Sequence, residues 1–516
     1  MVVATHRQGL PPPGVTAPDD HKDGTHSMTS SSRLHEPAAP AADAAFRLDW
    51  PAKTMLLAIL SSIFLAAMDQ TVVSTALPTI ARDLQGLKDL PWVVTAYLLT
   101  STVCLPIYGK LGDLVGRKPL LQTAILLFLA GSALAGLAQN MFQLILLRAL
   151  QGIGGGGLLV TALASISDFI PITQRGRYQG LVGGTFGLAT LLGPFLGGFL
   201  VEHLSWRWIF YINVPIGVAA FTIVTLAFPR PVRQPRVHID VAGMVLLTAS
   251  LSILVLFASL SGPVLPWRSP LPWVLLAAAV VLMLAFLQTE RRHREPVLPL
   301  SFFRFRTFAF SAAIAFFVGG AMLGSISFLP LYLQAVRGFT PTRSGLELLF
   351  LLVGMLVMSI ASGRWISRTQ RYRMFPIAGA SLITAALYLF SRLTADIPLW
   401  YIDGALILLG IGLGMTMQVL VLSAQITVAH RHLGVATATV SLFRSMGGTL
   451  GVATFGGILA GFLRGIPKAD PAAARTLIVE GLRMDFSIAV IFGFVAFVGT
   501  WFLEEMHILI ERRKTL

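Results

Sequence analysis

Long apolar runs, separated by short polar breaks that often contain Pro or Gly, follow one another from residue 54 to residue 504. About 20 mostly apolar residues are enough for a helix to cross a bilayer, so each run predicts one membrane-spanning helix. The runs predict fourteen spans, which are 54–80, 91–111, 119–138, 141–167, 176–201, 208–228, 239–260, 272–290, 307–333, 343–364, 373–391, 399–427, 433–463 and 482–504. We therefore expect an all-α integral membrane protein.

The first 53 residues do not fit this pattern. They are rich in Pro, His, Ala and Ser and contain no apolar run, so we expect a disordered cytoplasmic tail and not a cleavable signal peptide. The spans then fall into two groups of six with a pair between them. The predicted division is a tail at 1–53, a six-helix bundle at 54–228, a linker with two extra helices at 229–306, a second six-helix bundle at 307–504 and a tail at 505–516. Whether the chain starts at Met1 or at Met28 stays open, as do the roles of the N-terminal tail and of the two extra helices.

Composition agrees with a membrane protein. Hydrophobic residues make up 55% of the chain and charged residues 12%, against about 25% charged in soluble domains. The net charge of +15 does not indicate nucleic acid, because membrane proteins collect Lys and Arg in their cytoplasmic loops. Stretches such as GRWISRTQRYR (363–373) favour a cytoplasmic position for both termini, and we expect the protein in the plasma membrane. The single cysteine, Cys104, excludes an intrachain disulfide.

Two six-helix halves are an architecture of secondary transporters, which bind substrate near the midplane between the halves. The chain has no G-x-x-x-x-G-K-[ST] loop for a nucleotide, which leaves an ion gradient as the energy source. The spacing of His, Asp, Glu and possible nucleophiles indicates neither a metal site nor an enzyme. We expect a transporter without a cofactor.

The stretch GKLGDLVGRK (109–118) joins the second and third predicted spans. Gly109, Gly112 and Gly116 permit a tight turn and close backbone approach, and a charge cluster follows the second glycine. That cluster is Asp113, Arg117 and Lys118. A basic cytoplasmic turn alone explains the two cations but not the acid or the glycines. The stretch resembles the signature of the major facilitator superfamily, and the resemblance implies a cytoplasmic gate.

The stretch LLRALQGIGGGGLL (146–159) puts Arg148 inside the fourth predicted span. Gln151, Gly152 and Gly155 lie on the same helix face, and a glycine face lets a neighbouring helix approach closely. The alternative is that Arg148 snorkels to the membrane surface. The stretch resembles the superfamily motif R-x-x-Q-G, which implies that Arg148 takes part in proton coupling.

The fifth predicted span contains GLVGGTFGLATLLGPFLGGFL (180–200). Pro194 removes a backbone hydrogen bond, and Gly193, Gly197 and Gly198 offer a smooth surface to the opposite half. The spacing resembles the antiporter motif of drug:proton exporters, with Ala189 where that motif usually has Gly. WRWIFYINVPIG (206–217) likewise resembles the fourteen-helix drug:proton antiporters.

Asp69 lies within the apolar first span, where a charged residue costs about 2.5–3.5 kcal/mol at the centre of a membrane helix. LAAMDQTVVSTALP (65–78) resembles the helix-1 motif of the same antiporter group, which implies that Asp69 is a protonation site. Burial favours the neutral acid and a nearby cation such as Arg148 favours the carboxylate, so an aspartate between these effects suits a proton carrier. The alternative is a structural acid that caps a broken helix.

The second half yields secondary candidates. Ser367 stands where a second copy of the gate motif would have its acid, so a symmetric gate is in doubt. Arg444, in LFRSMGGTLG, either pairs with a carboxylate or contacts lipid headgroups. Glu347 and Asp403, near the external ends of their spans, either attract a cationic drug or are solvated acids.

Together these features predict a monomeric, lipid-surrounded antiporter that exports lipophilic, cationic drugs in exchange for protons. Three alternatives stay open: a dedicated exporter of one antibiotic, siderophore or lipid, a proton-coupled importer, and a membrane scaffold or enzyme. The sequence sets neither the substrate nor the number of protons exchanged.

Overall fold

A computed structural model describes residues 49–85, 90–171, 174–229, 240–261, 265–293, 296–463 and 471–505. Most of the two predicted tails, the alternative start and parts of the loops lie outside the described residues. Within them, the chain is helical and contains no β-strand, only an isolated bridge between Ser261 and Leu265. The fold class predicted from the sequence is confirmed.

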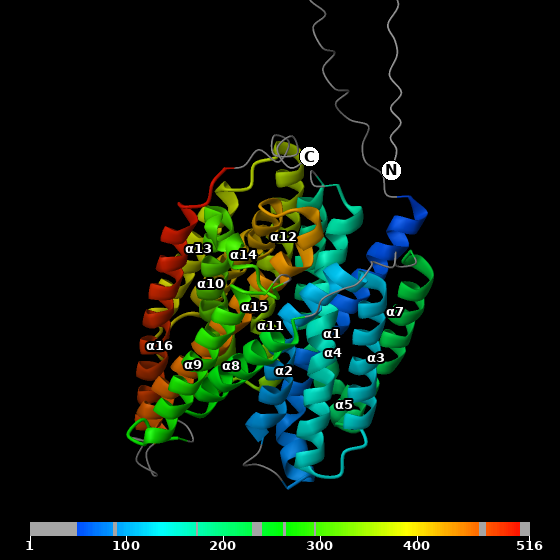
Figure 1. Ribbon diagram of the computed structural model, residues 1–516. Helices are drawn as coiled ribbons and strands as arrows, with labels where there is room; N and C mark the ends of the chain where they lie inside the picture. Colours follow the sequence, from blue (N-terminus) through cyan, green and yellow to red (C-terminus); the bar gives the residue numbers. More distant parts are fainter. Residues whose placement is uncertain are drawn as a thin grey trace, which may run out of the picture. The chain divides into compact units, whose positions relative to one another are not determined.

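The helices are shown in Figure 1. The α-helices are α1 (Trp50–Asp83), α2 (Leu90–Val115), α3 (Arg117–Ala135), α4 (Met141–Phe169), α5 (Arg175–His203), α6 (Trp208–Tyr211), α7 (Asn213–Ala227), α8 (Val241–Leu260), α9 (Pro270–Glu290), α10 (Arg306–Leu331), α11 (Pro341–Glu347), α12 (Leu349–Thr369), α13 (Met374–Ser391), α14 (Leu399–Ile426), α15 (Leu433–Leu463) and α16 (Pro471–Thr500). Short turns are η2 (Leu300–Arg304), η3 (Tyr332–Val336) and η4 (His430–His432).

All fourteen predicted spans are helical. In the described part of the chain, thirteen helices are long and apolar enough to cross a membrane, and the remaining prediction, 433–463, coincides with α15. Two spans are interrupted: 208–228 is divided into α6 and α7, and 343–364 into α11 and α12. The last helix begins at Pro471, eleven residues before the predicted 482, because a proline is well suited to the first turn of a helix.

The helices pack as two groups with a pair beside them. Helices α1 to α7 pack among themselves, α1 against α4, α5 and α7 and α4 against α2 and α3. Helices α10 to α16 do the same, chiefly α10 with α15 and α12 with α14. The groups meet where α2 lies against α15 and α5 against α12. Helix α8 packs on α9 and also touches both α2 and α15. The boundaries of the predicted domains stay a prediction.

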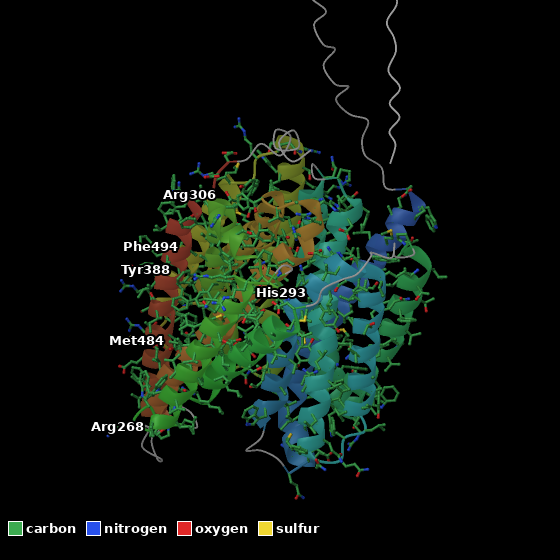
Figure 2. All side chains as sticks on the ribbon, viewed as in Figure 1. Arg268, His293, Arg306, Tyr388, Met484 and Phe494 are labelled. Carbon is green, nitrogen blue, oxygen red and sulfur yellow. The ribbon has the colours of Figure 1, made fainter. Side chains whose placement is uncertain are left out.

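The outer surface of these helices is apolar, as a lipid environment requires. Figure 2 shows Tyr388, Met484 and Phe494 on the outer side of α13 and α16, and each is about half exposed. Large exposed apolar side chains of this kind also occur on α3 and α9. On a soluble protein such a surface would form a contiguous apolar patch, whereas acyl chains cover it in a bilayer.

Glycines set how closely the helices approach. A Cβ atom on Gly447 of α15 would lie 1.8 Å from the carbonyl oxygen of Phe316 of α10. A Cβ atom on Gly363 of α12 would lie 2.2 Å from the carbonyl oxygen of Gly176 of α5. Without a hydrophobic driving force between helices in lipid, this close van der Waals packing holds them together.

This packing predicts that Gly447→Ala lowers the free energy of unfolding by about 1–3 kcal/mol, because α10 and α15 must separate to admit the methyl group. Gly457→Ala is the matched control on the same helix, since a Cβ atom at Gly457 would have no neighbour within 4 Å. The thermal unfolding midpoints of both variants in detergent measure the difference. Equal midpoints would contradict the packing argument.

Candidate functional site

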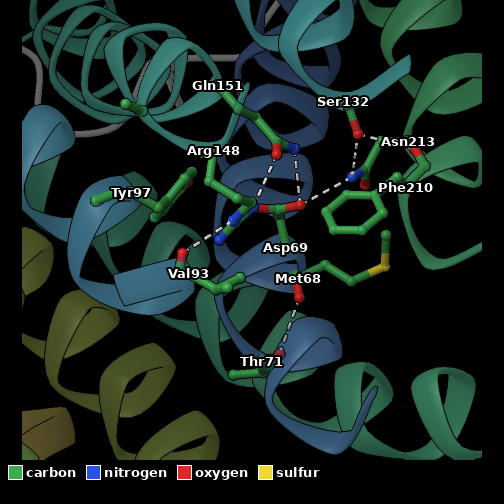
Figure 3. Close-up of polar contacts among 12 residues, drawn as sticks. Met68, Asp69, Thr71, Val93, Tyr97, Ser132, Arg148, Gln151, Phe210 and Asn213 are labelled. Atoms are coloured by element: carbon green, nitrogen blue, oxygen red, sulfur yellow. Dashed lines mark hydrogen bonds and ion pairs between the residues drawn. The ribbon is translucent and has the colours of Figure 1, made fainter. Parts of the chain in front are cut away.

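One carboxylate in the interior, that of Asp69 on α1, is enclosed by three donors (Figure 3). Its side chain is 0% exposed. Oδ2 accepts a hydrogen bond from Arg148 at 2.7 Å, and Oδ1 accepts one from the Gln151 amide at 2.8 Å and one from the Asn213 amide at 2.9 Å. Because every contact is donated to Asp69, this arrangement suits the ionised carboxylate.

Arg148, on α4, is equally enclosed. It donates to the side-chain oxygen of Gln151 at 2.7 Å and, through Nε, to the carbonyl oxygen of Val93 at 3.4 Å. Its guanidinium carbon lies 4.2 Å from the ring centroid of Tyr97, which adds a cation–π interaction. An arginine stays charged in proteins, so its burial requires such partners. Snorkelling to the surface, the alternative for Arg148, is wrong.

The glycines after Arg148 position the second helix. A Cβ atom on Gly152 would lie 2.5 Å from the carbonyl oxygen of Tyr97, and one on Gly155 would lie 2.4 Å from the Tyr97 hydroxyl. Only glycine at these positions lets α2 approach α4 so closely that Tyr97 reaches Arg148. The predicted glycine face therefore contacts α2.

Two members of this cluster, Asn213 and Ser132, were not predicted from the sequence. Asn213 begins α7 and donates to Asp69 and, at 3.0 Å, to the Ser132 hydroxyl. Ser132, on α3, donates in turn to the carbonyl oxygen of Phe210 at 2.8 Å. The signal was an amide within an apolar span, WRWIFYINVPIG, at the break between α6 and α7. Five helices thus supply the polar atoms around one carboxylate.

At one end of the two groups, Asp113 of α2 joins them. Its Oδ1 accepts the backbone N–H of Gly434 at 2.9 Å, and its Oδ2 accepts that of Val435 at 3.0 Å. These N–H groups belong to the first turn of α15, so Asp113 caps a helix of the other group from outside. The positive end of the helix dipole favours this carboxylate. Arg117 forms an ion pair with Asp113 and, at 3.0 Å, with Asp168 of α4.

The stretch 109–118 is thus not a loop, since α2 continues to Val115 and α3 begins at Arg117. Gly116 alone connects them, with φ of 97°, a conformation that favours glycine. Gly109 is required for contact, because a Cβ atom there would lie 2.8 Å from the carbonyl oxygen of Gly434. Lys118 donates to the carbonyl oxygens of Thr225 and Phe228 at the end of α7, at 2.8 and 2.7 Å.

A similar contact occurs between α12 and α5. The Ser367 hydroxyl accepts the backbone N–H of Arg177, in the first turn of α5, at 2.9 Å. Gly363 lies four residues before Ser367, just as Gly109 lies four residues before Asp113. The second half therefore repeats the capping contact with a neutral group in place of a carboxylate. The resemblance implied a gate against a helix of the other half, but Asp168 was not predicted from the sequence.

The glycines of the predicted antiporter stretch pack α5 against two different helices, α12 of the opposite group and α1 of its own group. A Cβ atom on Gly180 would lie 2.5 Å from the carbonyl oxygen of Ser359 on α12, in the opposite group. One on Gly193 would lie 1.9 Å from the Thr71 hydroxyl of α1, in its own group. The expectation that Gly193 faces the opposite half is therefore wrong. Gly198 has open space around a Cβ atom, Gly197 is buried, and the side chain of Pro194 lies outside the described part.

The secondary candidates fall in two places. Glu347 and Asp403, on α11 and α14, lie close enough for their side chains to hydrogen-bond. Within the described residues no carboxylate pairs with Arg444, so that alternative is wrong, and its contact with lipid headgroups stays a prediction. Among the described residues, no three or more His, Cys, Asp or Glu side chains are grouped to hold a metal ion.

A second acid of α1, Asp83, has different surroundings. It is largely exposed and accepts hydrogen bonds from the Trp206 indole at 2.7 Å and from Arg207 at 3.2 Å. These contacts, the indole first, hold the pKa of Asp83 below its ordinary value. Asp83 therefore serves as a control for substitutions at Asp69.

We expect Asn213→Ala to lower the free energy of unfolding by about 1–3 kcal/mol, because Asp69 loses one of three buried donors. Thr222→Ala, an exposed position of the same helix, should change stability by no more than ~0.5 kcal/mol. Thermal unfolding in detergent compares the two. Similar losses for both variants would contradict the role of Asn213 in holding Asp69.

We also expect Asp113→Ala to raise, at least about tenfold, the fraction of molecules in which α2 and α15 separate, because two charge-assisted hydrogen bonds are lost. Maleimide modification of Ala438→Cys, a buried position of α15 against Gly109 of α2, reports this separation in a Cys104→Ala background. Asp83→Ala is the control and should leave the rate unchanged. An unchanged rate in Asp113→Ala would show that this acid does not hold the groups together.

Comparison with known proteins agrees with this geometry. The family model of the Major Facilitator Superfamily matches residues 59–452. An uncharacterized MFS-type transporter of Mycobacterium tuberculosis is 40% identical over 406 residues, which are 79% of this chain and 59% of that protein. The chain thus spans about three fifths of that relative. The multidrug transporter protein MdtP of Bacillus subtilis is 35% identical over 408 residues, 79% of this chain and 75% of that protein.

Solved structures share the fold at low sequence identity. The proton:xylose symporter XylE superposes with a TM-score of 0.63 at 14% identity, over 88% of this chain and 96% of that one. The human organic anion transporter MFSD10 gives 0.60 at 13% identity, over 86% and 100%. With a family model over most of its length and multidrug transporters among its relatives, the chain belongs to the Major Facilitator Superfamily.

Proposed function

We propose that this protein is a proton-coupled antiporter that exports lipophilic compounds from the cytoplasm while protons enter. Family membership makes it a membrane transporter, and the relative named as a multidrug transporter supports export of drugs. The observation that carries the proposal is the Asp69 carboxylate, buried in a membrane helix and held by Arg148. An ionisable residue at such a depth is a functional candidate by its energetic cost alone.

Proton binding to Asp69 weakens the contacts that join α1 to α4 and α7. A neutral Asp69 no longer compensates the charge of Arg148, and its contacts to Gln151 and Asn213 lose their charge-assisted character. The cost of leaving Arg148 without a counter-charge favours a conformation in which it finds other partners or water. Protonation at Asp69 is thus a local charge change that biases the packing of α1 against α3, α4 and α7.

Helix α4 links Asp69 to the contact between Asp113 and α15 that joins the two halves. Arg148 and Asp168 lie on it twenty residues apart, or roughly 30 Å along a helix axis. Arg148 binds Asp69 at one end, and Asp168 binds Arg117 beside the capped helix α15 at the other. A movement of α4 that follows protonation therefore reaches the contact that holds the two halves together.

The two six-helix halves then rock about a midplane site. The contacts of Asp113 with α15 and of Ser367 with α5 close one end. We assign this end to the cytoplasm because Arg117, Lys118 and the 363–373 stretch make it basic. Both termini would lie in the cytoplasm and the protein in the plasma membrane. Gly193, Pro194, Gly197 and Gly198 would hold α5 in the form that antiport requires. No enzyme activity or cofactor is needed, and we expect a monomer among lipids.

The test is dye efflux in everted vesicles, driven by an imposed pH gradient. Wild type should accumulate a lipophilic dye, and Asp69→Asn should fall to the level of vesicles without the protein while still binding the dye. Asp83→Asn, in the same helix but exposed, should transport like wild type. If Asp69→Asn, inserted at equal amounts, still responds to the gradient, proton coupling lies elsewhere.

A further inference from the structure

Arg444 of α15 has no polar partner among the residues that the structure describes. Within the described residues no carboxylate forms an ion pair with it and no acceptor hydrogen-bonds to it, although it lies deep among the helices. Arg148, in the other half, has an ion pair, two further acceptors and an aromatic ring. Because an arginine does not lose its proton in proteins, Arg444 is a fixed positive charge without compensation.

The contacts of neighbouring residues show which way the face of α15 that carries Arg444 is directed. Thr437, seven residues earlier and so on the same helix face, accepts a hydrogen bond from Gln425 of α14 at 2.8 Å. Gln425 in turn accepts one from Ser167 of α4 at 2.8 Å, so this face looks inward, where α14 and α4 of the two halves meet. The backbone of Arg444 is fixed against α10, since a Cβ atom on Gly319 would lie 2.1 Å from its carbonyl oxygen.

The side chain is nevertheless partly accessible, so packing does not seal it off from a ligand. Ser441, one turn before Arg444, is 2% exposed, and its hydroxyl has no hydrogen-bond partner. Buried hydroxyls normally find a partner, so an unpartnered one a helical turn from an unpaired guanidinium is a second donor available to a ligand. Both groups are donors, and they sit on adjacent turns of one helix.

Among the described residues, no acid supplies a counter-charge to Arg444. Asp69 is bound by Arg148, and Glu347 and Asp403 lie against each other. Asp485 of α16 is buried, but neither of its oxygens has a partner, so it does not pair with Arg444. The interior of the second half therefore carries an unpaired cation at Arg444.

We propose that the Arg444 guanidinium, together with the Ser441 hydroxyl, binds a carboxylate or similar oxyanion group on the transported compound. The inference rests on the proposed export of lipophilic compounds and names their chemical class. A planar guanidinium matches a carboxylate with two parallel hydrogen bonds, and pairing would satisfy the buried charge. The preferred compounds are thus lipophilic molecules with an acidic group, and not the plain cations expected from the sequence.

Rhodamine B, which has a free carboxylate, and its methyl ester form a matched pair of probes. Fluorescence anisotropy of the full-length protein in detergent gives the dissociation constant of each dye. Wild type should bind the acid at least about tenfold more tightly than the ester, because a charge-assisted contact is lost in the ester. Arg444→Gln should bind both alike, Arg444→Lys should keep part of the preference, and Ser441→Ala should lose a smaller part. Arg483→Gln, an exposed arginine of α16, is the control and should behave like wild type.

Equal binding of acid and ester by wild type, failure to bind either, or a preference that survives in Arg444→Gln would overturn the proposal. Circular dichroism of each variant confirms that it is folded. Because binding is measured without a pH gradient, these outcomes are separate from the efflux test: a carboxylate preference with no gradient-driven transport would remove proton coupling and leave the Arg444 site intact.

Discussion

A charge inside a membrane protein must be compensated, and the architecture around Asp69 follows from that requirement. Asp69 and Arg148 are 0% and 2% exposed, so neither is hydrated from bulk water, and each depends on the other and on Gln151 and Asn213. Removing one partner from such a pair costs about 3–5 kcal/mol, which is comparable to the stability of a domain. That dependence allows a single proton to act on the packing of several helices.

At the contact between the halves, the charge of Asp113 is likewise compensated, although this site is less enclosed than that of Asp69. Asp113 is held by Arg117 and by the first-turn N–H groups of α15, so the partial charge of a helix end on one half binds a carboxylate on the other. Ser367 repeats the contact without charge. The two interfaces therefore differ in strength. The charged one is connected through Asp168 to α4, the helix that also carries Arg148.

The apolar runs were enough to predict the helices, because about 20 apolar residues have few alternatives to a membrane helix. They also located Asp69, Arg148 and Gln151, since polar groups in such runs are costly and stand out. Asn213 could not be predicted as a partner of Asp69, because its position arises from the packing of α7 against α1 and not from spacing along one helix. The prediction that Gly193 faces the opposite half was wrong for the same reason. A glycine-rich helix has several smooth faces, and tertiary contacts decide that Gly193 packs against α1.

The most direct measurement is the number of protons released when the purified protein binds substrate in weakly buffered detergent solution. If substrate binding and protonation of Asp69 favour different conformations of the two halves, linkage requires wild type to release protons on binding. Asp69→Asn should release none, while Asp83→Asn releases as many as wild type. A pH indicator dye reads the release directly. Proton release that is the same in Asp69→Asn and wild type would contradict the account, because the exchanged proton would then come from another group.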